Sequence, residues 1–185
     1  MPEIEIRPAN AADITALVGI DHDYVSDHVW QMEIQQDSGP GAADYRIDIH
    51  FRQVQLPRSV RVAYPRNPSV LTEDWKKRDC LLVAVLHSEV VGYNSMGLGQ
   101  APLTSWVTDL VVMRRCRRQG IGSALVLAAQ QWARQKGSYR LILEMQPKNY
   151  PAICMAQKLG FDLCGYNDRY YANHDIALFF GKSLW

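Results

Sequence analysis

The segment from residue 114 to residue 123, Arg-Arg-Cys-Arg-Arg-Gln-Gly-Ile-Gly-Ser, constrains the fold of this chain more than any other. It follows an alternating apolar segment that predicts a strand, and it precedes a segment whose apolar residues recur at helical spacing. Four arginines within five positions would be costly to bury, so the turn faces solvent or an anion. Its two glycines let backbone N–H groups turn toward a ligand, and a helix start adds partial positive charge. The pattern favours a phosphate cradle, with a plain solvated turn as the alternative.

The elements predicted around this turn alternate between strands and helices. We expect strands at residues 81–86, 90–96, 105–113 and 141–145, and one or two more at 161–184. One helix runs from about Gly122 to a C-terminal Gly137, and a second lies between the cap Asn149 and Gly160. This order predicts a mixed α/β sheet.

The first part of the chain gives weaker signals. Ile4 and Ile6 alternate with charged residues and predict a strand, followed by a short helix capped by Asn10. Residues 21–44 are polar and irregular, and they predict a loop that ends in Ser-Gly-Pro-Gly at 38–41. Residues 45–64 alternate and predict two strands separated at Pro57.

Length and composition exclude several classes of protein. The chain has 185 residues, which fits one domain, and 20 Lys plus Arg against 19 Asp plus Glu, which argues against a nucleic-acid binder. The longest apolar run is far shorter than a membrane span, and residues 1–10 do not resemble a secretory signal. The four cysteines lie far apart without a CxxC pair, so we expect a reduced, cytoplasmic protein without a zinc site.

Two common phosphate loops are excluded by spacing. The dinucleotide-binding fingerprint would need a third glycine where Leu125 stands. Gly-Lys-Ser at 181–183 resembles the end of a P-loop, but Ile176 occupies the first glycine position and too few residues follow for a helix.

Residues 117–122, Arg-Arg-Gln-Gly-Ile-Gly, match the R/Q-x-x-G-x-G/A motif, and with it the chain resembles the GCN5-related N-acetyltransferases, or GNAT family. The preceding segment 108–112 resembles the family's fourth strand, and 141–144 resembles its fifth. Asn149-x-x-Ala152 followed by Lys-Leu-Gly-Phe at 158–161 resembles its closing helix. A weaker resemblance, at 144–149 and 171–173, is to streptothricin acetyltransferase-like members.

This resemblance implies the fold and the cosubstrate. The expected fold is α/β (mixed α+β): one GNAT-like domain over residues 1–185, with a central twisted mixed sheet flanked by helices and a splayed fourth strand. Residues 1–80 would form the acceptor side and 81–185 the acetyl-CoA side. The cosubstrate would be acetyl-CoA, with no metal.

The resemblance also implies which residues bind acetyl-CoA. The amides of residues 118–123 would hold the pyrophosphate, nearby arginines would neutralise it, and the backbone of Leu110 and Val112 would bind the pantetheine and orient the thioester. Asn149 would contact the cofactor, and a helix N-cap is its alternative or additional role. The full set is Leu110, Val111, Val112, Arg117, Arg118, Gln119, Gly120, Ile121, Gly122, Ser123 and Asn149.

Two carboxylates are candidates for the catalytic base. A lysine-like amine has a pKa near 10.4, so holding it neutral at pH 7 costs roughly 4–5 kcal/mol, and a carboxylate can take the proton directly or through water. Glu144 ends an apolar strand and matches the base position of family members that acetylate protein N-termini; Asp109 is the second candidate. The alternative for either is a strand-end carboxylate paired with an arginine.

One departure from the family pattern concerns the general acid. Many members carry a tyrosine four residues before the glycine of the closing motif, where this chain has Ala156. Tyr166, Tyr170 or Tyr171 could reach the site instead, with ordinary packing as the alternative. A thiol has a pKa near 8.5, so its thiolate also leaves tolerably well unaided.

The acidic residues at 21–33 form no diagnostic metal spacing and instead suggest a solvated loop that lines a pocket for a cationic amine.

The sequence thus predicts transfer of an acetyl group from acetyl-CoA to a primary amine. A small cationic acceptor is expected: a streptothricin-like antibiotic, a polyamine or an amino sugar. The alternatives are a protein N-terminus or lysine, a non-catalytic acyl-CoA sensor, or a nucleotide-phosphate binder. We expect no nucleic-acid or membrane partner, and a homodimer stays open.

Overall fold

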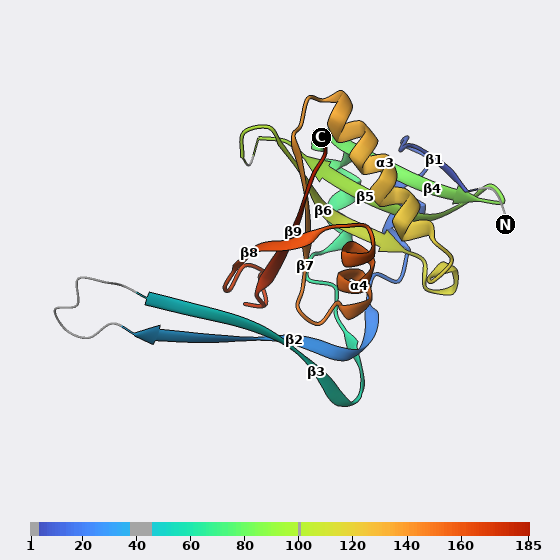
Figure 1. The fold of residues 1–185 in the computed structure, drawn as a ribbon. Helices are drawn as coiled ribbons and strands as arrows, with labels where there is room; N and C mark the ends of the chain where they lie inside the picture. Colours follow the sequence, from blue (N-terminus) through green and yellow to red (C-terminus); the bar gives the residue numbers. More distant parts are fainter. Residues whose placement is uncertain (1–3, 38–45, 100) are drawn as a thin grey trace.

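The computed structural model describes residues 4–37, 46–99 and 101–185, and its centre is a seven-stranded sheet in the order β1-β4-β5-β6-β7-β9-β8 (Figure 1). Neighbouring strands are antiparallel except β6 and β7, which are parallel. The strands are β1 (Glu5–Pro8), β4 (Cys80–Leu86), β5 (Glu89–Gly97), β6 (Thr104–Val112), β7 (Arg140–Met145), β8 (Asp162–Asn167) and β9 (Ala177–Ser183). The expected mixed α/β sheet is therefore confirmed.

Helices cover both faces of the sheet. The longer ones are α3 (Ile121–Gln135) and α4 (Tyr150–Lys158), and the shorter ones are α1 (Ile14–Val18) and α2 (Leu71–Asp74). Three 3₁₀ turns complete the list: η1 (Pro68–Val70), η2 (Trp75–Lys77) and η3 (Arg114–Cys116). None of the helices in the described residues is long and apolar enough to cross a membrane.

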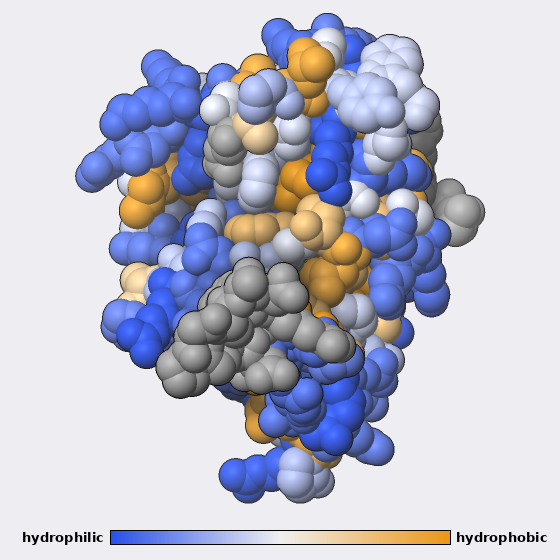
Figure 2. All heavy atoms as spheres, turned by 60° about the vertical axis from the view of Figure 1, so that its left-hand side comes forward, coloured by the Kyte–Doolittle hydropathy of each residue, from blue (hydrophilic) through white to orange (hydrophobic). Residues whose placement is uncertain are grey.

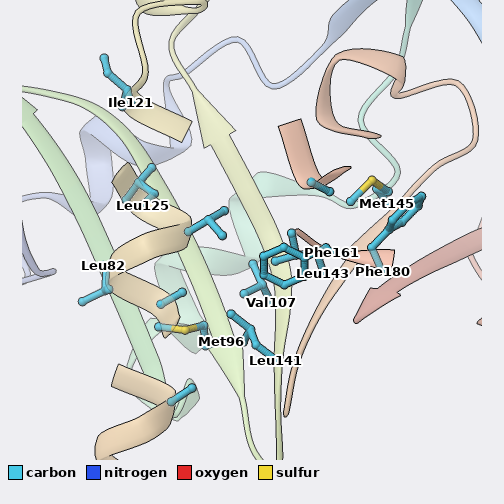
Figure 3. Packing of buried hydrophobic residues seen from close by; sticks show 14 of the residues in the cluster. Leu82, Met96, Val107, Ile121, Leu125, Leu141, Leu143, Met145, Phe161 and Phe180 are labelled. Atoms are coloured by element: carbon cyan, nitrogen blue, oxygen red, sulfur yellow. The ribbon is translucent and has the colours of Figure 1, made fainter. Parts of the chain in front are cut away.

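The core has two parts because successive residues of a strand point to opposite faces. Leu82 and Ala84 of β4 lie on the face covered by α3, whereas Leu81 and Val83 lie on the face covered by α1 and α2. Figure 3 shows Leu125 of α3 among the buried side chains of the first part, which also includes Met96, Val107, Leu143 and Phe180. The sheet is thus held between two helical layers, which fixes the positions of the strand ends.

The loop predicted at 21–44 is wrong over most of its length. Residues 24–37 form a strand, β2 (Tyr24–Asp37), which pairs with β3 (Arg46–Val62) in a separate two-stranded sheet. The polar residues of β2 obscure its alternation, but Trp30, Met32 and Ile34 lie on the same face as Gln53, Phe51 and Ile49 of β3. The Ser-Gly-Pro-Gly signal at 38–41 lies outside the described residues.

The two strands predicted between residues 45 and 64 are one continuous strand, β3. The pairing jumps from Ser26–Val60 to His28–Gln55, so Pro57 lies at an irregularity in the ladder. A proline there removes no ladder hydrogen bond, which is why it does not divide the strand. The β2–β3 hairpin projects from the body as an arm (Figure 1). On the face from which the arm projects, apolar patches lie toward the middle and polar residues dominate the lower margin (Figure 2).

Candidate active site

The central strands β6 and β7 separate, as the sequence predicts for its splayed strand. They pair only from Thr104–Arg140 to Val107–Leu143, while β6 continues to Val112 alongside β5. The gap forms a first cleft between the two strands, lined by Tyr24, Tyr64, Pro65, Arg66, Val107, Thr108, Leu110, Leu143, Glu144, Met145, Gln146, Asn149, Ala152, Met155 and Tyr171.

The backbone of β6 faces this cleft at alternate residues. The N–H of Met113 donates to the carbonyl of Val91, so these two residues form a hydrogen-bonded pair between β6 and β5. Such pairs occur at every second residue of an antiparallel strand, so the backbone of Val111 also bonds to β5. The N–H and C=O groups of Leu110 and Val112 point away from β5, toward the cleft. This is the orientation that backbone contacts from Leu110 and Val112 to pantetheine would need. Val111 packs into the second core and can support the site only from behind.

The turn after β6 presents unpaired backbone amides. Gly120 has φ +85°, a left-handed conformation suited to glycine, and the hydrogen bonds of α3 begin with Ala124 N–H donating to Gly120 at 3.0 Å. The N–H groups of Ile121, Gly122 and Ser123 therefore have no partner within the helix. A Cβ on Gly122 would lie 3.1 Å from Met155 Sδ, so glycine lets α3 approach α4 closely. These amides and the helix dipole fit the diphosphate of a coenzyme.

The two arginines assigned to the coenzyme differ in what they contact. The guanidinium of Arg117 donates to the carbonyls of Val112, Asp23 and Asp21 at 2.8, 2.9 and 2.8 Å, so it joins β6 to the segment before β2. Burial lowers the pKa of Arg117. Arg118 is exposed beside the amides, and Gln119 donates to the carbonyl of Arg115 at 3.1 Å. Arg118 is thus better placed than Arg117 to neutralise a phosphate.

Substituting these two arginines by alanine should affect different properties: the stability of the fold for Arg117 and the binding of CoA for Arg118. Arg117→Ala leaves three backbone carbonyls without their donor, so it should destabilise the fold by about 2–4 kcal/mol. Arg118→Ala should leave the free energy of unfolding within about 0.5 kcal/mol and weaken CoA binding severalfold. Denaturant unfolding and calorimetric titration with CoA measure both effects. Equal stability of the two variants would contradict the bracing role of Arg117.

Glu144 and Asp109 meet at one arginine, Arg66, which the sequence analysis did not single out. Arg66 pairs with Glu144 and lies 3.7 Å from Asp109, and it also donates to the carbonyl of Thr108 at 2.8 Å. The Glu144 side chain is fully buried, with the Tyr170 hydroxyl donating to it at 3.0 Å. Arginine pairing, which was the alternative role of both carboxylates, is therefore present.

Asp109 is the more heavily bonded of the two carboxylates. It accepts hydrogen bonds from the Tyr64 hydroxyl at 2.5 Å, Thr108 Oγ1 at 3.1 Å and Arg78 at 3.3 Å. Burial alone would lower the pKa of Arg66, but Glu144 and Asp109 more than offset this and hold it above its ordinary value. The cluster is a compensated set of buried charges in which Glu144 has fewer partners than Asp109.

A second cleft adjoins the first across Tyr64, Pro65, Arg66 and Tyr171. It has a cavity volume of about 450 Å³, within the range of small-molecule sites. Asp109 and Arg78 line it together with Asn67, Pro68, Val70, Leu71, Tyr93, Tyr170 and Ala172. A compound bound there would lie next to the end of the first cleft.

The C-terminal tail supplies tyrosines near Glu144. Tyr171 lines both clefts under the guanidinium of Arg66, whose Cζ lies 5.2 Å from the ring centroid, and burial raises its pKa. Tyr170 contacts Glu144, whereas Tyr166 packs against Phe51. Of the three tyrosines only Tyr171 lines both clefts, and Ala156, which stands where the family pattern has a tyrosine, is buried.

Asn149 caps α4 and lies at the first cleft. Its Oδ1 accepts from Ala152 N–H at 3.3 Å, which caps α4, and its side chain also lines the first cleft.

The acidic residues between positions 21 and 33 do not line either cleft, which corrects the expectation of an acidic acceptor pocket. Asp21 and Asp23 pair with Arg61, Asp27 pairs with His28, and Glu33 pairs with Arg52. Of residues 21–33, only Tyr24 reaches a cleft. Within residues 4–37, 46–99 and 101–185, no group of three or more His, Cys, Asp or Glu side chains lies close enough together to hold a metal ion.

Tyr64, Arg66, Arg78 and Tyr93 are the site residues that sequence reasoning missed. Arg66 reaches a residue 78 positions away and Tyr64 one 45 positions away, so local spacing could not reveal these contacts. The available signal was an arginine beside the Asn67-Pro68 turn, which reads as an ordinary solvated residue.

Comparison with known proteins identifies this architecture. The chain is 25% identical over 172 residues to streptothricin acetyltransferase of Streptomyces lavendulae, covering 90% of this chain and 86% of that protein. It is 29% identical over 144 residues to an N-alpha-acetyltransferase of Sulfurisphaera tokodaii, covering 70% and 86%. The crystal structure of nourseothricin acetyltransferase shares the fold, with a TM-score of 0.79 and 22% identity over 98% of this chain and 99% of that one. Residues 49–161 match the model of the acetyltransferase (GNAT) family, so the chain belongs to this family and is an acetyl-CoA-dependent N-acetyltransferase.

Proposed function

We propose that this protein acetylates a primary amine of a small cationic molecule, with streptothricin as the leading candidate. The observation that carries this proposal is the second cleft, which shares Arg66 and Tyr171 with the cleft that Glu144 lines, taken with the similarity to streptothricin acetyltransferase over most of both chains. Its volume of about 450 Å³ lies within the range of small-molecule sites.

In this proposal residues 1–80 shape the acceptor side and residues 81–185 hold the coenzyme. When bound, acetyl-CoA supplies the activated acetyl group as a thioester. Its diphosphate would lie on the amides of residues 118–123 beside Arg118, and its pantetheine along Leu110 and Val112, with Asn149 on the opposite wall. Acetyl-CoA accompanies the structure of a Bacillus anthracis protein of proposed streptothricin acetyltransferase activity, which shares this fold with a TM-score of 0.73 and 19% identity over 98% of this chain and 99% of that one. The expected cytoplasmic location is part of the proposal.

Glu144 is the proposed proton acceptor. Glu144 pairs with Arg66 and lines the first cleft, where it can take the proton of the acceptor's ammonium group directly or through a water molecule. Asp109 has more hydrogen-bond donors around it and is assigned a supporting electrostatic role. The Tyr171 hydroxyl keeps its proton and is available to the departing sulfur.

The decisive test is amine-dependent thiol release from acetyl-CoA. A panel of streptothricin, an aminoglycoside, spermidine, lysine amide and short peptides with free N-termini covers both the leading acceptor class and its rivals. We expect the highest kcat/KM with streptothricin. A peptide as the best acceptor would favour the second candidate, an N-terminal acetyltransferase, which the similarity to the Sulfurisphaera protein supports. Release with none of the amines, from folded protein that binds CoA, would favour an acyl-CoA sensor.

A further inference from the structure

The charged side chains around the second cleft differ in how many of their hydrogen-bonding groups are already engaged. The carboxylate of Asp109 accepts three hydrogen bonds within the protein, one of them from Arg78. Arg66 is engaged at both terminal nitrogens, which donate to the carbonyl of Thr108 and to the carboxylate of Glu144. Asp109 and Arg66 are therefore bound mainly to other groups of the protein.

Arg78 is the arginine of this cleft that keeps free donors. It lies between η2 and β4, and its Nη1 donates to Ser95 Oγ at 3.0 Å and to Asp109 Oδ2 at 3.3 Å. In the part of the chain that the structure describes, its Nε and Nη2 make no hydrogen bond, and the side chain is 26% exposed on the wall of the second cleft. These two nitrogens lie on one edge of the planar guanidinium, where paired N–H groups can receive a carboxylate or a carbonyl oxygen.

Arg78 and Glu144 lie at opposite ends of a row of alternating charges. Arg78 pairs with Asp109, which lies 3.7 Å from Arg66. Arg66 in turn pairs with Glu144. The row leads from the second cleft into the first, because Arg66 lines both clefts, whereas Arg78 lines the second and Glu144 the first. A single ligand that occupies both clefts can therefore reach the two ends of the row.

We infer that Arg78 is a specificity-determining residue: it binds a carbonyl or carboxylate oxygen of the acceptor whose amine reacts beside Glu144. This inference rests on the proposed function, since it assigns the second cleft to the acceptor. Pro68, Val70 and Ala172 line the same cleft, and their apolar groups suit the carbon chain that joins the two polar ends. The acceptor class is thereby narrowed to amines that carry such an oxygen several bonds away. A protonated polyamine has only N–H donors and leaves the edge of Arg78 without a partner.

The test uses three amines with the same carbon chain: lysine, lysine amide and cadaverine, which lacks the carboxyl group. Each competes, at saturating acetyl-CoA, with the best acceptor among streptothricin, an aminoglycoside, spermidine and short peptides, and mass spectrometry quantifies that acceptor's acetylated product. The Ki of lysine or of lysine amide should be about tenfold or more below that of cadaverine, because a hydrogen bond to a charged group is lost with the oxygen. A lower Ki for lysine than for its amide would assign a carboxylate, and the reverse order a neutral carbonyl.

The variant Arg78→Lys tests whether the guanidinium causes this preference. Lysine keeps the positive charge beside Asp109 but not the planar pair of donors, so the preference over cadaverine should fall to about threefold or less. A purely structural role of Arg78 would change the Ki of all three compounds alike and preserve the preference. The matched control is Arg61→Lys, at an exposed arginine that pairs with Asp21 and Asp23 outside both clefts, and it should keep the native preference.

The outcomes separate this inference from the proposed function. Equal Ki values for the three compounds in native protein, or an unchanged preference in Arg78→Lys, would overturn the role of Arg78 and leave the proposed function intact. The ranking in native protein is decisive even if the variant does not fold. Acetyl transfer to none of the amines, or to peptides alone, would contradict the proposed function and the role of Arg78 with it.

Discussion

Replacing Glu144 with glutamine should lower the rate of acetyl transfer by about 10²–10⁴-fold, the usual contribution of a general base. Glutamine is nearly isosteric, and its Oε1 can still accept from Arg66 or Tyr170, so the fold and the first cleft should persist. In the proposed mechanism, the variant loses the carboxylate that takes the proton of the ammonium group. Single-turnover rates with saturating acetyl-CoA measure the loss, and the Kd for CoA should stay within about twofold of the native value.

The matched controls for this prediction are two other carboxylates. Glu33 lies on the β2–β3 arm in an exposed pair with Arg52, so the Glu33→Gln variant should transfer acetyl groups at the native rate. Asp109→Asn should slow transfer less than Glu144→Gln does. If Asp109→Asn shows the larger loss, the proton-accepting role belongs to Asp109, and native rates in both variants would exclude either carboxylate as the base.

Replacing Arg66 with methionine should destabilise the fold by about 3–5 kcal/mol, because it leaves the buried Glu144 carboxylate without a cationic partner. Asp109 keeps Arg78, Tyr64 and Thr108, so most of the cost arises at Glu144. Urea unfolding of the native protein and the variant at pH 7.5 measures this loss.

A double-variant cycle at Arg66 and Glu144 distinguishes the cost of an unpaired charge from the cost of lost packing. Arg66→Met combined with Glu144→Gln should recover much of the lost stability, because no unpaired charge remains. Arg61→Met removes an exposed arginine that pairs with Asp21 and Asp23, and it should cost no more than about 1 kcal/mol. A loss of similar size in Arg61→Met and Arg66→Met would show that burial of Glu144 is not the cause.

The sequence predicted the second half of the fold well because its signals are local. The apolar run of β4, the glycines at 120 and 137 that take left-handed conformations, and the Asn149 cap all act within a few residues. The first half was predicted poorly because β2 owes its structure to pairing with β3, and Pro57 is tolerated only because the ladder is interrupted there. No pattern within either strand alone contains that information.

The candidate site likewise contains residues that local sequence signals predict and residues that they do not. The amides near Gly120 and the backbone of Leu110 follow from a strand, a turn and a helix in sequence. The carboxylates Glu144 and Asp109 could be proposed from their strand positions, but the arginine that joins them comes from a loop 78 residues before Glu144. Such partners become visible only when the sheet order is known.

The separation of β6 from β7 also bears on which strand edges of the central sheet a neighbouring chain could reach. A strand edge without a partner is normally a place where another chain can add a strand and begin to aggregate. Here the unpaired edge of β6 lies inside the sheet instead of at its rim, and Arg66 and Arg117 occupy the carbonyls of Thr108 and Val112 on either side of Leu110. The rim strands β1 and β8 are only 4 and 6 residues long. The gap between β6 and β7 can therefore offer main-chain hydrogen bonds to an elongated small ligand at an edge that the backbone of a neighbouring chain cannot easily enter.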